Sequence, residues 1–518
     1  MASRTERVLV ASAFVIYLAL AILLSRTMYS WDDETAHLAF GRAVWTSGAS
    51  LFQDELPGHR MPLPFYVIGI TQVLFGPTLW GGRLLSIAIG LTTLALLVAV
   101  MRRLEGREAA VLAALLFATQ GVLVGYFATA LYISLTASIL LAAVWLMIRD
   151  DLRWHATLAM ATASLLFFTR TNLFPAIPFF VVWALAVARR PVERLVIVLL
   201  AVVPPAVFLL SDPLHLKLLA HVPLMGGLVE PLGYKSVFEL QELPASGLGQ
   251  RLAGIALVGR RYESWVVAAA GVIVGGVVAR ARRRSLEGLV PHGKPLIVVA
   301  LFAWLVVTHL VILRMNYKWL AAYFPVIAPL AVAILAGATA RLLLRVDLPA
   351  LGRAAVAVGI AGGLTISLVA IRHPLLPTPR AWPFRGDAIQ LANDAAAGLR
   401  ALVPPGSRVF LFGSSTPVYL AGLEAPPSQM WSALGNVVET RHGAFVARSG
   451  VWGPVEVERW LGFELSYAVI DPEAVVTMAA ERPRVVERIR ALLRERFVPI
   501  GRVEARPWFA YDVYRRRS

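Results

Sequence analysis

Residues 79–101 read LWGGRLLSIAIGLTTLALLVAVM, and the charged residue of this stretch, Arg83, lies near its start. A helix needs about 20 mainly apolar residues to cross the hydrocarbon core of a bilayer. Similar stretches recur along the chain, so we expect a polytopic α-helical membrane protein with about eleven transmembrane helices. The predicted spans are residues 8–25, 79–101, 109–128, 130–148, 155–169, 173–188, 193–211, 263–280, 295–313, 319–340 and 351–371.

The composition supports this prediction. Of the 518 residues, 58% are hydrophobic and 16% are charged. Soluble globular proteins have about 45–50% apolar and about 25% charged residues. The excess of apolar side chains excludes a soluble enzyme and a disordered chain. The chain has no cysteine, which excludes disulfides and thiol catalysis.

The net charge of +17 has two interpretations. A basic chain can bind nucleic acid, but in a membrane protein the basic loops mainly set the orientation. With the N-terminus inside, the short inner loops are basic; one holds Arg102, Arg103 and Arg107. We therefore expect a multi-pass protein of the plasma (inner) membrane with a cytoplasmic N-terminus, lipid around it and no nucleic-acid partner.

Two regions differ in composition. Residues 1–371 hold the predicted spans and two long outer loops, 26–78 and 212–262. Residues 372–518 hold no predicted span and carry +5 of the net charge. Their short apolar runs alternate with amphipathic pieces, which indicates a small α/β domain. Eleven spans place this domain on the extracytoplasmic side. The apolar runs are residues 408–412, 467–470 and 509–514, and 482–497 is amphipathic.

The first outer loop opens with an acidic run. Residues 31–37 read WDDETAH, which places Asp32, Asp33 and Glu34 side by side beside the first span. Adjacent carboxylates repel one another and are costly near a medium of low dielectric constant. At helical spacing Asp33 and His37 share one face, so the carboxylate could bond the imidazole. The alternative is a solvated helix N-terminus, where acidic residues are favoured.

A basic, proline-rich turn follows in the same loop. Residues 59–66 read HRMPLPFY, so Arg60 precedes Pro62 and Pro64. Prolines fix the direction of the chain and end a helix. The alternative is a rigid turn into the next membrane segment, with Arg60 bound to lipid headgroups.

These motifs resemble the GT-C membrane glycosyltransferases, in particular the protein O-mannosyltransferases and the aminoarabinose transferase acting on lipid A. That group shows Asp-Glu in the first outer loop and a Lys-Pro-Pro-like turn some thirty residues later. Here Asp33-Glu34 and the 60–64 segment occupy those places, and residues 169–172 and 314–325 also look like family features. The sequence departs from the pattern at the turn, where Arg60 replaces the lysine and one proline is displaced. The additional Asp32 leaves two registers open for the acidic pair.

The resemblance implies transfer of a sugar, such as mannose or arabinose, from a polyprenyl-phosphate donor to an acceptor on the outer face. The acceptor would be a hydroxyl of a glycan, lipid or protein of the cell envelope. An acceptor hydroxyl needs a base that takes its proton. We predict Asp33 as this base in an inverting reaction. Glu34 would orient the base or the acceptor, and Asp32 and His37 would support them.

Cations are needed to stabilise the negative charge on the leaving lipid phosphate. The planar guanidinium of arginine fits the oxygens of a phosphate. Each cation alone is also explained as an anchor that reaches the headgroups. We expect that no cofactor or metal is required. Binding of a divalent cation by Asp32, Asp33 and His37 remains an alternative. The predicted phosphate-binding residues on the outer side are Arg60, Arg170, Arg260, Arg261, Arg314 and Lys318.

Two other function classes remain. A transporter or flippase of a lipid-linked or small solute usually carries ionisable residues in mid-span and symmetric broken helices. The sequence shows few such charges and no repeat. A non-catalytic assembly or sensor protein would leave the acidic run unexplained.

Overall fold

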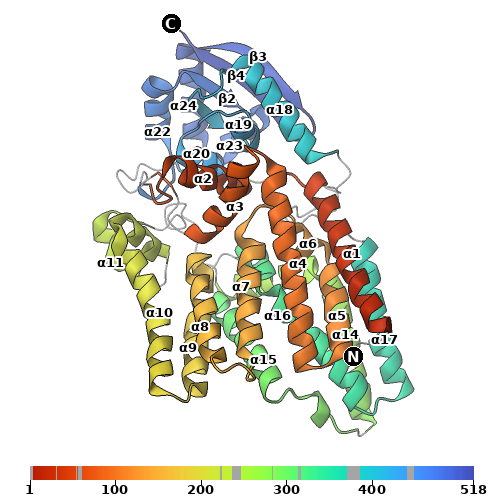
Figure 1. Cartoon of the computed structure of the whole chain (residues 1–518). Helices are drawn as coiled ribbons and strands as arrows, with labels where there is room; N and C mark the ends of the chain where they lie inside the picture. The colour runs from red at the N-terminus through yellow and green to blue at the C-terminus, as the bar shows by residue number, and fades with distance from the viewer. Residues whose placement is uncertain are drawn as a thin grey trace.

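The computed structural model describes residues 4–30, 32–53, 55–56, 61–221, 225–235, 247–282, 284–312, 317–369, 386–439 and 448–517. Two parts are visible in Figure 1. A bundle of helices forms the lower part, which we call the helical body, and residues 386–517, the C-terminal region, lie above it. The N-terminus lies at the end of the body far from this region, and the C-terminus lies at the tip of the molecule (Figure 1).

The helical body contains α-helices joined by short 3-10 and π-helical turns. Its α-helices are α1 (Arg4–Thr27), α2 (Asp32–Ser47), α3 (Pro62–Leu74), α4 (Leu79–Leu104), α5 (Arg107–Ala118), α6 (Gly121–Phe127), α7 (Tyr132–Met147), α8 (His155–Ser164), α9 (Ala176–Val187), α10 (Pro191–Ser211), α11 (Gly226–Val229), α13 (Leu248–Arg261), α14 (Glu263–Ala281), α15 (Lys294–Val307), α16 (Tyr317–Arg345) and α17 (Ala350–Val369). The other turns are η1 (Leu165–Phe168), η2 (Thr171–Leu173), η3 (Pro213–His221), η4 (Glu230–Leu232), η5 (Glu287–Leu289) and the π-helix η6 (Thr308–Ile312).

Several of these helices are long and apolar enough to cross a membrane. Among the described residues there are six, or seven if the bent pair α5 and α6 forms one span. All eleven predicted stretches coincide with helices or helix pairs, but the number of spans stays a prediction because four of the eleven lie on shorter helices. The shorter apolar helices are Pro62–Leu74, Tyr132–Met147, His155–Phe168, Thr171–Val187 and Lys294–Leu310.

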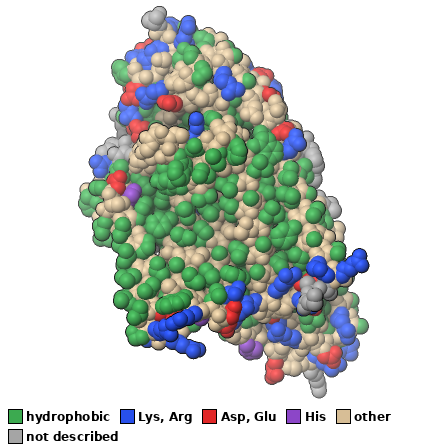
Figure 2. Space-filling view, viewed as in Figure 1, with side chains coloured by type: hydrophobic (Ala, Val, Ile, Leu, Met, Phe, Trp, Pro, Cys, Tyr) green, Lys and Arg blue, Asp and Glu red, His purple; other side chains and the backbone are tan. Residues whose placement is uncertain are grey.

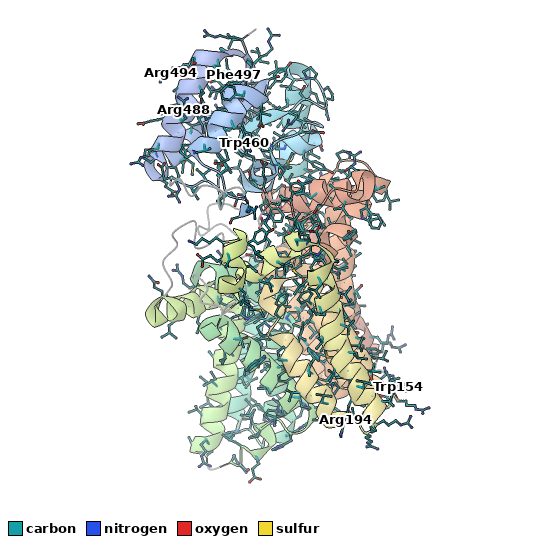
Figure 3. The ribbon with its side chains drawn as sticks, turned by 90° about the vertical axis from the view of Figure 1, so that its left-hand side faces the viewer. Trp154, Arg194, Trp460, Arg488, Arg494 and Phe497 are labelled. Carbon is teal, nitrogen blue, oxygen red and sulfur yellow. The ribbon has the colours of Figure 1, made fainter. Side chains whose placement is uncertain are left out.

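The surface of the body matches a membrane environment. Figure 2 shows hydrophobic side chains covering the middle of the body, with lysine and arginine gathered at its lower end. On α10, Val192, Leu195 and Leu210 are exposed, which an aqueous surface would penalise. Arg194 and Trp154 lie at the end far from the C-terminal region (Figure 3). Tryptophan and arginine are favoured at membrane interfaces, so this end fits one edge of the apolar belt.

Helices α2 and α3 lie between the body and the C-terminal region (Figure 1). They cross at Gly41 and Gly69, where a Cβ atom on Gly69 would lie 2.2 Å from the backbone of Gly41. The lack of side chains allows the two helix backbones to touch. This close crossing fixes α2, which carries the acidic run.

The C-terminal region is built on a four-stranded sheet in the order β1-β2-β4-β3. Strands β1 and β2 are parallel, and the β2–β4 and β3–β4 pairs are antiparallel. The apolar runs predicted at 408–412, 467–470 and 509–514 coincide with three strands, whereas β3 did not follow from the sequence. The elements are α18 (Ala388–Leu402), β1 (Val409–Phe412), α19 (Thr416–Leu420), α20 (Pro427–Ser432), α22 (Pro454–Arg459), η7 (Trp460–Glu464), β2 (Tyr467–Ile470), α23 (Pro472–Glu481), α24 (Pro483–Arg496), β3 (Phe497–Ala505) and β4 (Phe509–Arg516).

Alternate residues of β1 enter two different cores. Val409 and Leu411 pack in a cluster with α18, and Phe410 and Phe412 pack on the opposite face with α22 and α24. The cluster with α18 continues into the helical body, where it includes Leu38 of α2. The C-terminal region is therefore joined to α2 by a shared apolar core.

Candidate functional site

The site is built around the first turn of α2, which contains Asp32, Asp33 and Glu34. Helix N-termini favour carboxylates because the first amide groups have no partner within the helix. The three side chains leave the helix in different directions, and each meets a different part of the protein. Their surroundings therefore separate three chemically similar residues into three roles.

Glu34 is fully buried and ion-paired. Arg83 of α4 donates to both of its carboxylate oxygen atoms, with 2.8 Å from Nε to Oε1 and 2.6 Å from Nη2 to Oε2. Oε1 also accepts the backbone N–H of Ala130 at 2.8 Å. With no exposed surface, this carboxylate ties α2 to α4. Its position fits a structural role better than the predicted orientation of an acceptor.

Asp33 meets the C-terminal region. Its Oδ1 atom accepts a hydrogen bond from the indole Nε1 of Trp431, on α20, at 2.8 Å. Trp431 is almost fully buried. The predicted base is thus held by a residue that lies almost 400 positions later in the chain.

Asp32 bonds a second segment of the C-terminal region. Its Oδ1 accepts the backbone N–H of Ser415 at 3.1 Å and the Ser415 hydroxyl at 3.3 Å. Burial raises the pKa of Asp32 to about 7, the Ser415 donors oppose this rise, and the charge of Asp33 adds to it. Close by, the Thr416 hydroxyl bonds those of Ser30 at 2.7 Å and Thr35 at 2.6 Å.

His37 lies one turn along α2 and is buried in an aromatic cluster. Its ring stacks on Phe65 at 4.5 Å and lies 6.1 Å from the rings of Tyr132 and Trp431. Its Nδ1 donates to the backbone carbonyl of Asp33 at 2.6 Å, since a carbonyl can only accept. The predicted shared face of Asp33 and His37 is thus present, and the Nδ1 bond joins His37 to the backbone carbonyl of Asp33.

Arg170 is the predicted phosphate ligand that the structure brings towards Asp33. Its guanidinium lies over the rings of Tyr132, at 4.3 Å, and Tyr323, at 5.0 Å, and donates to the Tyr323 hydroxyl at 2.9 Å. Burial disfavours the charged form, yet the neighbouring tyrosines and the Asp33 carboxylate raise the pKa of Arg170. The guanidinium therefore stays charged and interacts electrostatically with the predicted base.

The other predicted phosphate ligands are placed differently. Arg60 and Arg314 lie outside the described residues, as does the side chain of Lys318 on α16. Arg260 and Arg261 end α13, where Arg260 is exposed and Arg261 donates to the Tyr126 hydroxyl at 3.4 Å.

An apolar groove begins beside this arginine pair. It has a volume of about 380 Å³ and lies between α13, α14, α15 and α16. Val258 and Gly259, which precede Arg260, line it together with Tyr262. A cationic pair at the end of an apolar groove is complementary to an anionic lipid.

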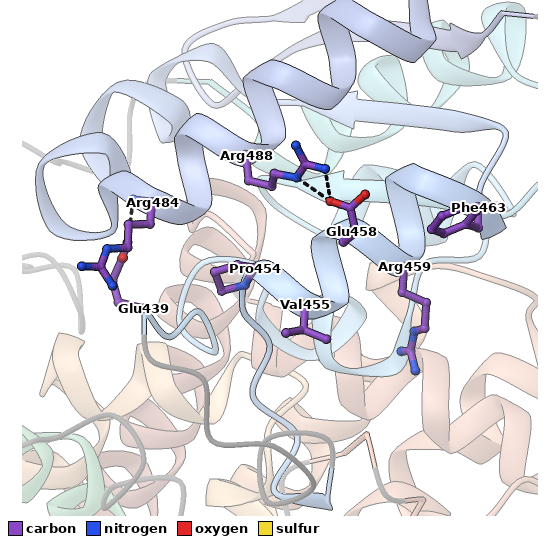
Figure 4. Close-up of a pocket in the computed structure, with 8 residues that line it drawn as sticks. All are labelled: Glu439, Pro454, Val455, Glu458, Arg459, Phe463, Arg484 and Arg488. Atoms are coloured by element: carbon purple, nitrogen blue, oxygen red, sulfur yellow. Dashed lines mark hydrogen bonds and ion pairs between the residues drawn. The ribbon is translucent and has the colours of Figure 1, made fainter.

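A second hollow, of about 920 Å³, lies between α22 and α24 of the C-terminal region (Figure 4). Two of its three arginines are paired with carboxylates: Arg488 with Glu458, and Arg459 with Glu55 of the first outer loop at 2.7 Å. These pairs make the hollow a weaker candidate for a phosphate than the neighbourhood of Arg170.

The described residues hold no group of three or more histidine or acidic side chains that could bind a metal ion. Sequence reasoning missed Arg83 as the partner of Glu34 and missed Trp431 altogether. The signal for Arg83 was its charge inside an apolar stretch, where a buried partner is expected. No sequence pattern around Trp431 indicates a functional role, because its importance arises only from its contact with α2.

Comparisons with known proteins agree with this architecture. Residues 59–211 match a family described as dolichyl-phosphate-mannose-protein mannosyltransferase. The structure of AglB, the Archaeoglobus fulgidus oligosaccharyltransferase, in complex with an inhibitory peptide and a dolichol-phosphate is 13% identical with a TM-score of 0.51, over 95% of this chain and 72% of that chain. The arabinofuranosyltransferase AftD from Mycobacteria is 15% identical with a TM-score of 0.50, over 100% of this chain and 40% of that chain.

The chain has a GT-C fold. The GT-C resemblance inferred from the acidic run and the proline-rich turn is thus confirmed. ArnT from Cupriavidus metallidurans, bound to undecaprenyl phosphate, is also similar, with 14% identity and a TM-score of 0.48 over 99% of this chain and 98% of that chain. None of the curated protein sequences matches this chain.

Proposed function

We propose that this GT-C protein is an inverting glycosyltransferase that moves a sugar from a polyprenyl-phosphate donor to an acceptor hydroxyl on the outer face of the membrane. The observation that carries the proposal is a pair of opposite charges that interact: Asp33 of α2, which is held by Trp431, and Arg170, whose charged form the Asp33 carboxylate favours. A base and a cation side by side are what acid–base transfer from a phosphate ester requires.

In the proposed step, the acceptor oxygen attacks the anomeric carbon of the sugar while Asp33 takes the hydroxyl proton. The bond from the anomeric carbon to the phosphate oxygen breaks, and its electron pair leaves with the lipid phosphate. Attack from the side opposite the phosphate inverts the anomeric centre. Arg170, whose charge interacts with that of Asp33, would stabilise the negative charge that develops on the phosphate.

A lipid-linked donor is supported by the apolar groove that begins beside Arg260 and Arg261. The groove would hold part of the polyprenyl chain, and the two arginines would attract its phosphate. The AglB structure with a similar fold contains a dolichol-phosphate, which is a ligand of this class. The acceptor would be a glycan, lipid or protein.

The proposed topology has a cytoplasmic N-terminus in the plasma membrane and an extracytoplasmic α/β domain at 372–518. In the structure the C-terminal region and the N-terminus lie at opposite ends of the body (Figure 1), as an odd number of spans requires. We further propose that no metal is needed, so transfer should persist in EDTA. Its loss in EDTA and recovery with Mg²⁺ or Mn²⁺ would contradict this part.

The test uses the full chain in lipid nanodiscs with a panel of radiolabelled polyprenyl-phosphate sugars and an envelope extract as acceptor. Asp33→Asn should reduce transfer about 10²–10⁴-fold, the range for a positioned base. Asp394→Asn, an equivalent change on the exposed surface of α18, should leave the rate unchanged. Transfer by Asp33→Asn at the wild-type rate would refute the role of the base. Solute transport into vesicles without consumption of a lipid-linked sugar would favour the transporter.

A further inference from the structure

The C-terminal region contacts the acidic run through the polar bonds described for Ser415, Thr416 and Trp431. The Trp431 bond differs from the others because its acceptor is the carboxylate of the proposed base. We propose that Trp431 is a positioning residue for Asp33, so that the catalytic site is complete only when the C-terminal region is seated on α2. This inference rests on the proposed function of Asp33.

The indole is held from several sides. Its ring packs against Phe65 at 5.6 Å and stacks on Phe40 at 6.1 Å, and 2% of the residue is exposed. Its helix α20 is fixed to the sheet, because the side-chain oxygen of Gln429 accepts the backbone N–H of Leu411 at 3.0 Å. A donor fixed by packing and by a bonded support can hold its acceptor in one orientation.

The chemistry of the donor suits a base. Glu34 is fully buried, and a guanidinium binds both of its carboxylate oxygens. Asp33 Oδ1 accepts a hydrogen bond from the neutral indole of Trp431. A neutral donor fixes the direction of a carboxylate with a smaller effect on its basicity than a cation has. The two neighbouring acids are thus separated into an anchor and a base.

The charged and titratable groups around Asp33 explain why a fixed orientation is needed. Asp32 repels it, Arg170 attracts it, and His37 bonds its backbone carbonyl. The helices α3, α19 and α20 that pack on α2 carry no charged side chain, whereas α4 contributes Arg83, which is paired with Glu34. The indole bond fixes the position of Asp33 Oδ1 among these charges.

The experiment replaces Trp431 in the full chain with phenylalanine and with β-(3-benzothienyl)alanine, in which sulfur replaces the indole N–H and the ring shape is kept. Each variant is reconstituted in nanodiscs, and its transfer rate is measured against donor concentration and pH. The matched control is Trp452→Phe. Trp452 is fully buried in the same region, and among the described residues its Nε1 has no hydrogen-bond partner.

We expect kcat to fall about tenfold to 100-fold in both Trp431 variants, part of the 10²–10⁴-fold that a positioned base contributes. The donor KM should stay within about twofold. The acidic limb of the pH–rate profile should move to higher pH, because a carboxylate that loses a donor holds its proton more tightly. A purely structural defect would not move this limb, and Trp452→Phe should not move it either.

A wild-type kcat and pH profile in the benzothienyl variant would overturn the role of Trp431 and leave the proposed function intact. If Trp431→Phe fails to fold, the benzothienyl variant alone tests the role of Trp431, since it keeps the packing of the ring. Equal transfer by wild type and Asp33→Asn would instead refute the proposed function of Asp33, and the inference with it.

Discussion

Glu34 and Arg83 form a two-pronged ion pair from which solvent is excluded, with 2.6 Å between Glu34 Oε2 and Arg83 Nη2. Arg83 also donates to the backbone carbonyls of Ser25 and Met28 at the end of α1. One guanidinium therefore joins α1, α2 and α4 at the point where the acidic run begins. This junction fixes the helix that carries Asp33, so its effect on activity would be indirect.

Loss of one partner of this pair should strongly destabilise the protein. Arg83→Met leaves a buried carboxylate without its cation, and such changes cost about 3–5 kcal/mol. The thermal midpoint in detergent should fall accordingly. Arg284→Met is the control: its pair with Asp347 is exposed on both sides, and exposed pairs contribute about 0–1 kcal/mol. Equal midpoints for the two variants would contradict this account of Arg83.

Asp32 should make stability depend on pH near neutrality. Its pKa is raised from 3.8 to about 7 in the folded state, so between these values the folded chain binds more protons than the unfolded one. Stability contributed by this group is therefore present at low pH and is lost as pH rises towards 7. The difference in thermal midpoint between Asp32→Asn and wild type should grow from pH 5 to pH 7 and then level off. A constant difference would show that Asp32 does not titrate in this range.

Local patterns predicted the helices well because apolar length and periodicity are properties of neighbouring residues. All eleven predicted stretches coincide with helices, but residues 109–128, predicted as one span, form α5 and α6 with a bend of 74° between them. The break falls at Thr119 and Gln120, between two apolar runs. Composition does not distinguish a straight helix from a bent pair when both are buried.

The candidate site was predicted in part. The acidic run indicated the correct helix, but its three carboxylates are equivalent in the sequence. The structure distinguishes them through partners far away in the chain: Arg83 for Glu34, and Trp431 for Asp33. Such pairings depend on how the parts of the chain pack together, which spacing within one loop does not encode.

Arg170 should affect the chemical step more than the fold. Arg170→Lys keeps a positive charge but loses the planar contact with Tyr132, whereas Arg170→Gln loses the charge beside Asp33. We expect kcat to fall about tenfold for the lysine variant and about 10²–10³-fold for the glutamine variant, as for other groups that stabilise a developing anion. Initial rates at a saturating donor concentration will show whether the glutamine variant is slower than the lysine variant. Equal rates for the two variants would show that the charge of Arg170 has no part in the transfer.

The apolar groove should determine how the enzyme responds to the length of the donor lipid. Ala338 of α16 lines the groove, so Ala338→Trp should occupy space that the chain would use. Each CH₂ group that is kept out of an apolar site loses about 0.8 kcal/mol of favourable burial free energy. Excluding two of them should therefore raise the KM for a long-chain donor roughly tenfold. A donor with a single isoprene unit should be affected little.

Val358→Trp provides the matched control for this change. Val358 lies on α17 with 72% of its surface exposed, and it does not line the groove. It should therefore leave both KM values unchanged, since the same bulk is added to the outer surface. An equal rise in KM for short and long donors in Ala338→Trp would mean that the tryptophan distorts the phosphate end of the site. An unchanged KM for the long donor would exclude the groove as the binding site of the lipid.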